Sequence, residues 1–262
     1  MKGCFIVFEG IDGAGKGVQV TELAKKLRKA KYKLKTTKEP THNRPIGKLI
    51  HKILYNSETV PDEALALLFA ADRADHIKHK IVPALNSGAV VLSDRYVYSS
   101  YAYQTKGMDT EIDLEWIKTI NKVMIEPDVV IFLDIPPEVG LNRLQKGQKR
   151  IRDDSYFEEL YKQEQIRSMY YKVLNLEGMG NNLWEFSEKR IRKNEKKIKV
   201  TRLNGTSVLR IDGTLPIKDI EKIIYNYVKK YLEVNKTPKL VKNKISPQVL
   251  SRFMKVDEEN VR

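Results

Sequence analysis

The stretch from Cys4 to Val18 constrains the fold of this chain more than any other feature. An apolar run leads into the glycine-rich loop GIDGAGK at residues 10–16, which fits the pattern G-x-x-x-x-G-K, and an amphipathic helical pattern follows. Strand, glycine loop and helix in this order are typical of a P-loop, in which backbone N–H groups close around phosphate oxygens at the positive end of a helix dipole. Lys16 adds a point charge on the phosphates. Because a merely structural glycine turn rarely has this order, we predict a site for a nucleoside triphosphate.

The P-loop departs from its usual ending at Gly17 and Val18. The general pattern places Ser or Thr after the lysine, and that hydroxyl binds Mg²⁺, whereas Gly and Val have no hydroxyl. Either Mg²⁺ is held by nucleotide oxygens, water and acids elsewhere, or the loop is partly disabled; we favour the first alternative. The loop residues that we expect to bind the nucleotide are Gly10, Ile11, Asp12, Gly13, Ala14, Gly15, Lys16, Gly17 and Val18.

The net charge of +14 invites a nucleic-acid function, but its distribution argues against one. Segments 143–152, 176–202 and 235–262 together carry +13 of that charge, which leaves the rest of the chain nearly neutral. The excess therefore lies in a candidate lid, an insert and a tail, and we expect no nucleic-acid partner.

Composition also bounds the class of protein. A hydrophobic fraction of 41% is enough for a real core, and no apolar run approaches eighteen residues, so we expect no membrane span. Cys4 is the only cysteine, which excludes an internal disulfide framework and fits a reducing compartment. The chain enters a strand at once, without a signal-peptide pattern, so we expect a cytoplasmic protein.

Alternating strand and helix patterns predict an α/β fold that is doubly wound, with three layers and a central five-stranded parallel sheet. The predicted helices include one that starts at Pro61 and three at 114–123, 156–174 and 216–232. Ligands of such folds bind outside the carboxyl ends of the strands. The predicted strands cover residues 4–8, 33–37, 89–93, 128–134 and 207–211.

Three further segments complete the organisation. We expect one kinase-sized domain over 1–234, with a basic lid at about 143–155 and an insert at about 176–206. The insert is either helical or a small hairpin. The hairpin is an alternative because Asn204 and Gly205 could form a tight turn. Residues 235–262 form a basic C-terminal extension that is either flexible or docked on a partner.

Two segments outside the P-loop place polar side chains where a ligand of this fold would bind. Glu39 follows the second predicted strand, although the loop at Pro40 can equally be a simple turn. Phe69 and Arg73 share one helical face, so an aromatic ring and a guanidinium could stack on and hydrogen-bond a base. Taken alone, a core Phe with a surface Arg explains the same spacing.

Asp94 and Arg95 come directly after the third predicted strand, at the end that faces the ligand crevice. Arg95 could clamp a phosphate bidentately, and the Ser and Gln side chains that follow could hydrogen-bond base edges. A capping Asp with a salt-bridging Arg is the structural alternative, but it does not account for the extended motif. That motif continues with Ser99, Ser100, Tyr103 and Gln104.

A basic segment follows the fourth predicted strand and precedes a long helix, which favours a lid over a solvated run of charges. Arginines that close over transferring phosphates would exclude water and stabilise developing charge. The basic residues of this segment are Arg143, Lys146, Lys149, Arg150 and Arg152.

Taken together, these motifs resemble those of the thymidylate kinase (dTMP kinase) family, over roughly residues 1–174 and 207–232. The resemblance implies a P-loop kinase fold with a helical lid, which transfers the γ-phosphoryl of ATP to dTMP and gives dTDP and ADP in dTTP biosynthesis. It also implies Mg²⁺ as cofactor and a homodimer. The segments that carry it are FEGIDGAGK at 8–16, EPT at 39–41, LFAADR at 68–73, DRY at 94–96 with Ser99, Ser100 and AYQ at 102–104, and IDG at 211–213 with the final helix.

The resemblance assigns most of the candidate residues to the acceptor dTMP. Phe69 would stack on thymine, and Arg73 would bond a thymine oxygen. Arg95 would hold the acceptor phosphate, and Glu39 would lie near the acceptor site. Ser100 and Gln104 would lie by the base, Tyr103 by the sugar and Asp12 near the sugar 3′-hydroxyl. Ser99 is the remaining expected acceptor residue.

The resemblance also implies a catalytic set. Family members carry a catalytic arginine either in the P-loop or in the lid, and Gly13 and Ala14 leave that role here to the lid. Asp94 is the candidate Mg²⁺ ligand. The expected catalytic residues are Lys16, Asp12, Arg95 and a lid arginine. Arg150 and Arg152 are the first candidates for the lid arginine, and Arg143 is the third. Arg143 is also expected to contact the nucleotide.

Three departures from the family pattern keep alternatives open. They are Gly17 followed by Val18, the absence of a glycine pair after Pro40, and the insert and tail. One alternative is a kinase for another nucleoside monophosphate or for a deoxynucleoside. The other is a nucleotide-binding regulatory protein with a degenerate site, which contacts nucleic acid through its insert and tail.

Overall fold

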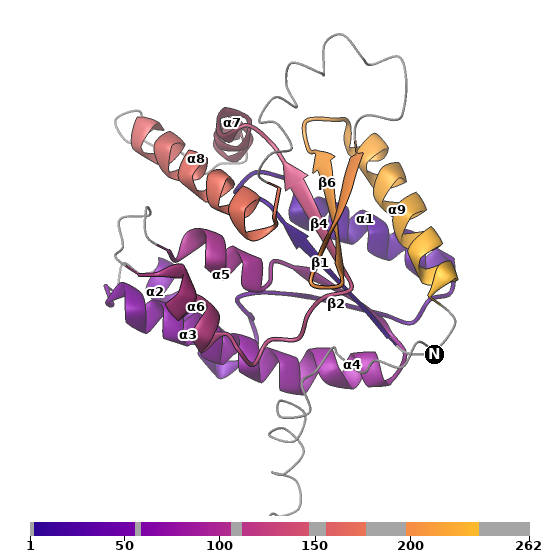
Figure 1. The fold of residues 1–262 in the computed structure, drawn as a ribbon, viewed down its shortest axis with the longest axis horizontal. Coiled ribbons are helices and arrows are strands. Elements are labelled where there is room, and N and C mark those ends of the chain that lie inside the picture. Colours follow the sequence, from indigo (N-terminus) through magenta and orange to yellow (C-terminus); the bar gives the residue numbers. More distant parts are fainter. Residues whose placement is uncertain (1–2, 56–58, 106–111, 147–155, 177–197, 236–262) are drawn as a thin grey trace, which may run out of the picture.

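A computed structural model describes residues 3–55, 59–105, 112–146, 156–176 and 198–235 (Figure 1). The lid arginines Arg150 and Arg152, most of the insert and the C-terminal extension lie outside these ranges. The strands are β1 (Cys4–Glu9), β2 (Leu34–Lys38), β3 (Val90–Asp94), β4 (Val129–Asp134), β5 (Ile198–Leu203) and β6 (Thr206–Asp212). The helices are α1 (Lys16–Lys29), α2 (Pro45–Tyr55), α3 (Asp62–His76), the π-helix η1 (Ile77–Ile81), α4 (Val82–Asn86), α5 (Val97–Tyr103), α6 (Leu114–Ile120), α7 (Pro137–Lys146), α8 (Tyr156–Val173) and α9 (Ile217–Val234).

The described strands form one sheet in the order β2-β3-β1-β4-β6-β5. The first five strands of this order are parallel, which confirms the predicted parallel sheet. The five predicted strands make up this parallel part, and β5, from the end of the insert, adds a sixth strand antiparallel to β6. Asn204 and Gly205 both adopt left-handed backbone angles, with φ of +48° and +88°, so a tight hairpin turn joins the two strands. The hairpin alternative for the end of the insert is therefore correct.

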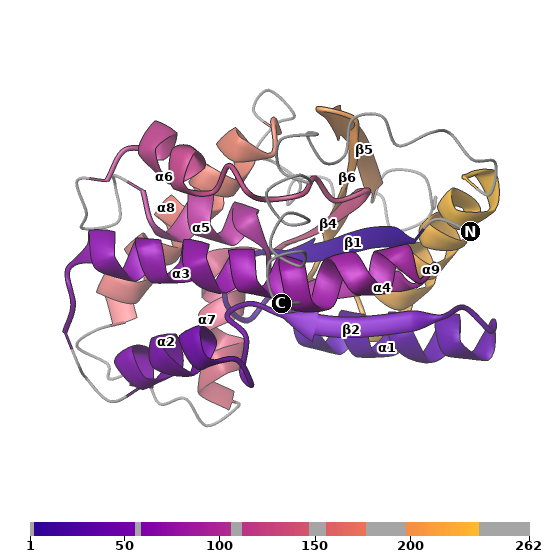
Figure 2. The same cartoon turned by 90° about the horizontal axis from the view of Figure 1, so that it is seen from below.

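Helices cover both faces of the sheet, as Figures 1 and 2 show. Helices α1 and α9 pack against each other on one face, while α3, α5 and α8 lie on the other, with α5 against α8. Every residue of β1, β4 and β6 is buried, which explains the nearly continuous apolar runs of β1 and β4. The three layers place the carboxyl ends of β1, β2 and β3 beside one another.

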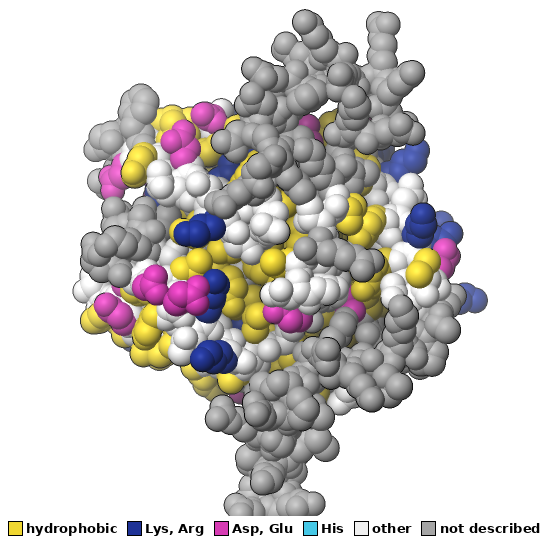
Figure 3. Space-filling model, viewed as in Figure 1, with side chains coloured by type: hydrophobic (Ala, Val, Ile, Leu, Met, Phe, Trp, Pro, Cys, Tyr) yellow, Lys and Arg dark blue, Asp and Glu magenta, His cyan; other side chains and the backbone are white. Residues whose placement is uncertain are grey.

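The surface agrees with the charge distribution that the sequence predicts for the body of the protein. In the view of Figure 3, basic and acidic side chains are interspersed with apolar ones over the described surface. Among the described helices, none is both long and apolar enough to cross a membrane.

Candidate active site

The P-loop between β1 and α1 folds around its own lysine. Lys16 is buried, and its Nζ donates hydrogen bonds to the carbonyl oxygens of Gly10 at 2.9 Å and Ile11 at 2.8 Å. Burial, followed by repulsion from Arg95, lowers the pKa of Lys16 to about 8. A phosphate beside this ammonium would offset both effects, so the loop is suited to an anionic ligand.

Glycine is required in this loop by a backbone-to-backbone contact with α7. A Cβ added at Gly13 would lie 2.3 Å from the carbonyl oxygen of Gly140, and Gly13 has a φ of +75°. Conversely, a Cβ added at Gly140 would lie 2.4 Å from the carbonyl oxygen of Asp12. The contact leaves no room for a side chain at position 13.

Asp94 lies beside Gly17, the position at which the usual P-loop carries a hydroxyl. A Cβ added at Gly17 would lie 3.2 Å from Asp94 Oδ2. Asp94 Oδ1 is buried, and no hydrogen-bond partner for it is found among the described residues. An unsatisfied buried carboxylate oxygen is a suitable ligand for Mg²⁺, a hard cation that prefers oxygen. The residues present therefore fit the cation, although no cluster of three or more His, Cys, Asp or Glu residues occurs in the described part of the chain.

Arg95 has an unusual backbone that directs it to the P-loop. It has a φ of +67°, in the left-handed region that non-glycine residues rarely adopt, and such outliers often mark functional positions. Its guanidinium forms an ion pair with Asp12 and donates to Ser99 Oγ at 3.0 Å. It also donates to the Tyr103 hydroxyl at 3.2 Å and lies 4.8 Å from the centre of that ring. These partners fix the guanidinium beside the P-loop, to which Asp12 belongs.

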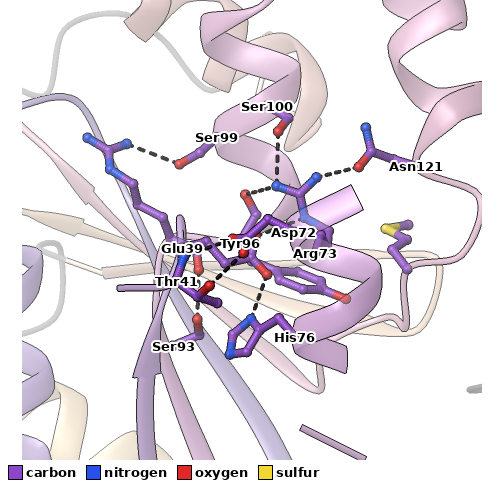
Figure 4. Close-up of polar contacts among 12 residues, drawn as sticks. Glu39, Thr41, Asp72, Arg73, His76, Ser93, Tyr96, Ser99, Ser100 and Asn121 are labelled. Carbon is purple, nitrogen blue, oxygen red and sulfur yellow. Dashed lines mark hydrogen bonds and ion pairs between the residues drawn. The ribbon is translucent and has the colours of Figure 1, made fainter. Parts of the chain in front are cut away.

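Arg73 lies in a second, fully buried network (Figure 4). Its Nε donates to Glu39 Oε2 at 2.9 Å, and its Nη2 donates to Ser100 Oγ at 2.9 Å. Its Nη1 donates to the side-chain oxygen of Asn121. The contact brings together two residues that the sequence analysis expects on the acceptor side, and the alternative of a surface arginine is wrong.

The loop after β2 is held against α3 by two acids. Thr41 donates through its backbone N to Asp72 Oδ2 at 2.8 Å and through its hydroxyl to Asp72 Oδ1 at 2.5 Å. On Glu39, Oε1 accepts from His76 Nδ1 at 2.9 Å. Glu39 therefore bridges Arg73 and His76, and the loop at Pro40 is more than a simple turn.

One cavity of about 420 Å³ joins the P-loop to these elements. Arg73 and Ser100 lie behind its wall and are connected to it through Glu39. The residues that line the cavity are Asp12, Gly13, Gly15, Lys16, Gly17, Val18, Lys38, Glu39, Pro40, His42, His51, Tyr55, Asp94 and Arg95.

Two other expected acceptor residues lie near this network. Phe69 is half-buried on α3, one turn before Arg73. Gln104 follows α5, and its side-chain oxygen is buried without a hydrogen-bond partner in the part of the chain that the structure describes. An amide oxygen in this state is available to accept a hydrogen bond from a ligand.

Arg143 is the one candidate for the catalytic lid arginine among the described residues. It lies on α7 and donates to the carbonyl oxygens of Gly13 at 3.2 Å and Gly213 at 2.9 Å. Burial lowers its pKa. These contacts place it beside the P-loop, as expected for a residue that contacts the nucleotide.

Several site residues were missed in the sequence. His42 stacks on His51 with ring centroids 4.0 Å apart, and His51 stacks on Tyr55 at 5.8 Å. The spacing of four between His51 and Tyr55 was an available signal for a shared helical face. Asn121 and His76 had no such signal, because their partners lie 48 and 37 residues away along the chain.

Comparisons with known proteins agree with this geometry. A family model described as thymidylate kinase matches residues 8–198, more than half of the chain. A probable thymidylate kinase of Thermococcus kodakarensis is 41% identical over 181 residues, which cover 66% of this chain and 84% of the relative. A probable thymidylate kinase of Pyrococcus horikoshii is 41% identical over 182 residues, covering 67% and 85%. A thymidylate kinase of Caldicellulosiruptor saccharolyticus is 37% identical over 189 residues, covering 69% and 90%. The chain belongs to the thymidylate kinase family.

Proposed function

We propose that this protein is a dTMP kinase, which transfers the γ-phosphoryl of ATP to dTMP and releases dTDP and ADP. The observation that carries the proposal is that two cations, Lys16 and Arg95, line the same cavity. One cation belongs to a P-loop, which binds donor phosphates, and the other belongs to a separate element that can hold a second phosphate. A phosphoryl transfer between two bound phosphates needs this arrangement.

The donor side would be formed by the P-loop. Its backbone N–H groups and Lys16 would bind the β and γ phosphates of ATP, and Arg143 would hold the loop from α7. Asp94 would hold Mg²⁺, because one of its oxygens has no protein partner among the described residues and it lies beside Gly17. Mg²⁺, when bound, neutralises charge on the transferring phosphoryl group. Arg150 and Arg152 remain candidates for the catalytic lid arginine.

The acceptor side would be formed by Arg95 and the buried network behind the cavity. Arg95 would bind the phosphate of dTMP, and Asp12, its ion-pair partner, would contact the sugar with Tyr103. Arg73 would donate to a thymine oxygen, because Glu39, Ser100 and Asn121 fix its guanidinium. Phe69 would stack on the base, and Ser99, Ser100 and Gln104 would complete its surroundings.

The test is ADP formation from ATP and Mg²⁺ with each of dTMP, dUMP, dGMP, dAMP, dCMP and thymidine. We expect strong turnover with dTMP and its loss in Arg95→Ala, the matched control. Turnover with a different acceptor would replace the proposal by another nucleoside-monophosphate or deoxynucleoside kinase. ATP binding without turnover of any acceptor would favour a regulatory protein. The same proposal includes a homodimer in the cytoplasm, and light scattering after size-exclusion chromatography would test for the dimer.

A further inference from the structure

Glu9, the last residue of β1, is a fully buried carboxylate that accepts three hydrogen bonds. Its Oε1 accepts from the backbone N of Tyr96 at 2.8 Å. Its Oε2 accepts from Ser99 Oγ at 2.7 Å and from the Tyr170 hydroxyl at 2.9 Å. Nothing in the P-loop motif requires this residue to be acidic, so the carboxylate needs a separate explanation.

The contacts of Ser99 connect this carboxylate to Arg95. Ser99 Oγ lies 3.0 Å from Arg95 Nη1 as well as 2.7 Å from Glu9 Oε2. A guanidinium can only donate and an ionised carboxylate can only accept. The Ser99 hydroxyl must therefore donate to Glu9, which leaves its oxygen free to accept from Arg95.

Helix α8 reaches the same point through Tyr170. The Tyr170 hydroxyl lies 2.9 Å from both Glu9 Oε2 and Ser99 Oγ. The Tyr170 ring also packs edge-on against Tyr103, with centroids 6.3 Å apart, and Tyr103 contacts Arg95. One buried carboxylate thus fixes β1, α5 and α8 around the arginine.

We infer that Glu9 is a positioning residue for the acceptor phosphate: its ionised carboxylate orients the Ser99 hydroxyl, and Ser99 in turn orients the Arg95 guanidinium. The inference rests on the proposed function, in which Arg95 binds the phosphate of dTMP.

The inference predicts a pH dependence of acceptor binding. Burial raises the pKa of Glu9 to about 7, against the lowering effects of Ser99 and Arg95. The charged groups that face Glu9 are Arg95 and Lys16, and the titratable ones are Tyr98, Tyr103 and Tyr170. Below pH 7 the protonated carboxyl would carry an O–H that competes for the oxygen of Ser99. The KM for dTMP should therefore rise as the pH falls through 7.

The experiment measures kcat and the KM for dTMP from pH 6 to 8.5 in wild type and Glu9→Gln. The loss of one hydrogen bond to a charged group predicts a KM about tenfold higher for Glu9→Gln at pH 8, with a smaller change in kcat. The ratio of the two KM values should fall toward one at pH 6. The phosphate of dTMP itself titrates near pH 6, but it does so equally for both proteins, so it cancels in the ratio.

Two further variants keep the test decisive. Ser99→Ala leaves the buried carboxylate in place and interrupts only its connection to Arg95, so it should also raise the KM and flatten its pH dependence. Glu115→Gln removes an exposed acid on α6, outside the site, and should keep the wild-type profile. Circular dichroism would show whether each variant is folded.

The outcomes separate the inference from the proposed function. Wild-type protein that does not phosphorylate dTMP would overturn the proposed function, and this inference with it. If wild type is active and a folded Glu9→Gln keeps the wild-type KM profile, the inference alone is overturned. If Glu9→Gln does not fold, the same result in Ser99→Ala would overturn it.

Discussion

Substitution of alanine for Gly13 should destabilise the protein far more than the same change at Gly15. Both glycines have left-handed φ values, +75° and +90°. A Cβ at Gly13 would lie 2.3, 2.7 and 2.8 Å from three backbone atoms of Gly140, whereas nothing lies within 4 Å of a Cβ at Gly15. The two variants therefore share the backbone strain and differ in the steric clash.

The difference can be estimated from these contacts. Left-handed backbone costs an ordinary residue about 1–2 kcal/mol, which applies to both variants. Gly13→Ala must also push α7 away from the loop, and overpacking of this kind costs about 1–3 kcal/mol. Because 1 kcal/mol shifts the Tm of a protein of this size by about 2–4 °C, Gly13→Ala should melt about 2–12 °C below Gly15→Ala.

The assay is thermal unfolding of nucleotide-free protein, supported by urea unfolding at 25 °C. Gly140→Ala serves as the matched variant, since its Cβ would lie 2.4 Å from the carbonyl oxygen of Asp12 without a left-handed φ. It should be destabilised by the clash alone. A Gly13→Ala protein as stable as Gly15→Ala would refute the backbone contact between the P-loop and α7.

Three other predictions concern charged side chains of the site and its surroundings. Arg73→Ala leaves Glu39 buried without its cation and should lower the free energy of unfolding in urea by about 3–5 kcal/mol. Adding Glu39→Gln to this variant should restore part of the lost stability. A double variant with no recovery would contradict the ion pair between Arg73 and Glu39. Asp94→Asn should raise the Mg²⁺ concentration needed for half-maximal rate, and an unchanged Mg²⁺ titration would exclude Asp94 as a ligand. Folding raises the pKa of Glu9 from 4.5 to about 7. Between pH 4.5 and pH 7 the unfolded state therefore binds fewer protons than the folded state. The free energy of unfolding should fall as the pH rises through this range. Glu9→Gln should flatten this dependence, and a variant with the wild-type slope would show that another group causes it.

The parallel core of the fold was predictable from the sequence because buried parallel strands are apolar on both faces. The runs in β3 and β4 and the loop after β1 were sufficient to predict the strand positions and the edge of the sheet where the site lies. The sixth strand was harder to predict, because apolar and polar residues alternate over only the first four positions of Ile198–Leu203, inside a basic segment. Only the turn residues Asn204 and Gly205 indicated that this segment pairs with β6.

The candidate site was predictable to the extent that its residues follow strand ends in recognisable motifs. Arg95 and Glu39 belong to this class, and the structure brings both to one cavity. His76 and Asn121 do not, since each acts through a buried partner supplied by another element. Spacing along one helix cannot indicate such partners, which depend on tertiary packing.

The left-handed backbone of Arg95 has a consequence for protein engineering. A non-glycine residue in this conformation costs about 1 kcal/mol or more, whereas Gly and Asn adopt it readily. A library of variants that is screened only for heat resistance should therefore enrich Gly or Asn at position 95. A library that is screened for phosphoryl transfer should retain Arg, so the two screens should select different residues at position 95.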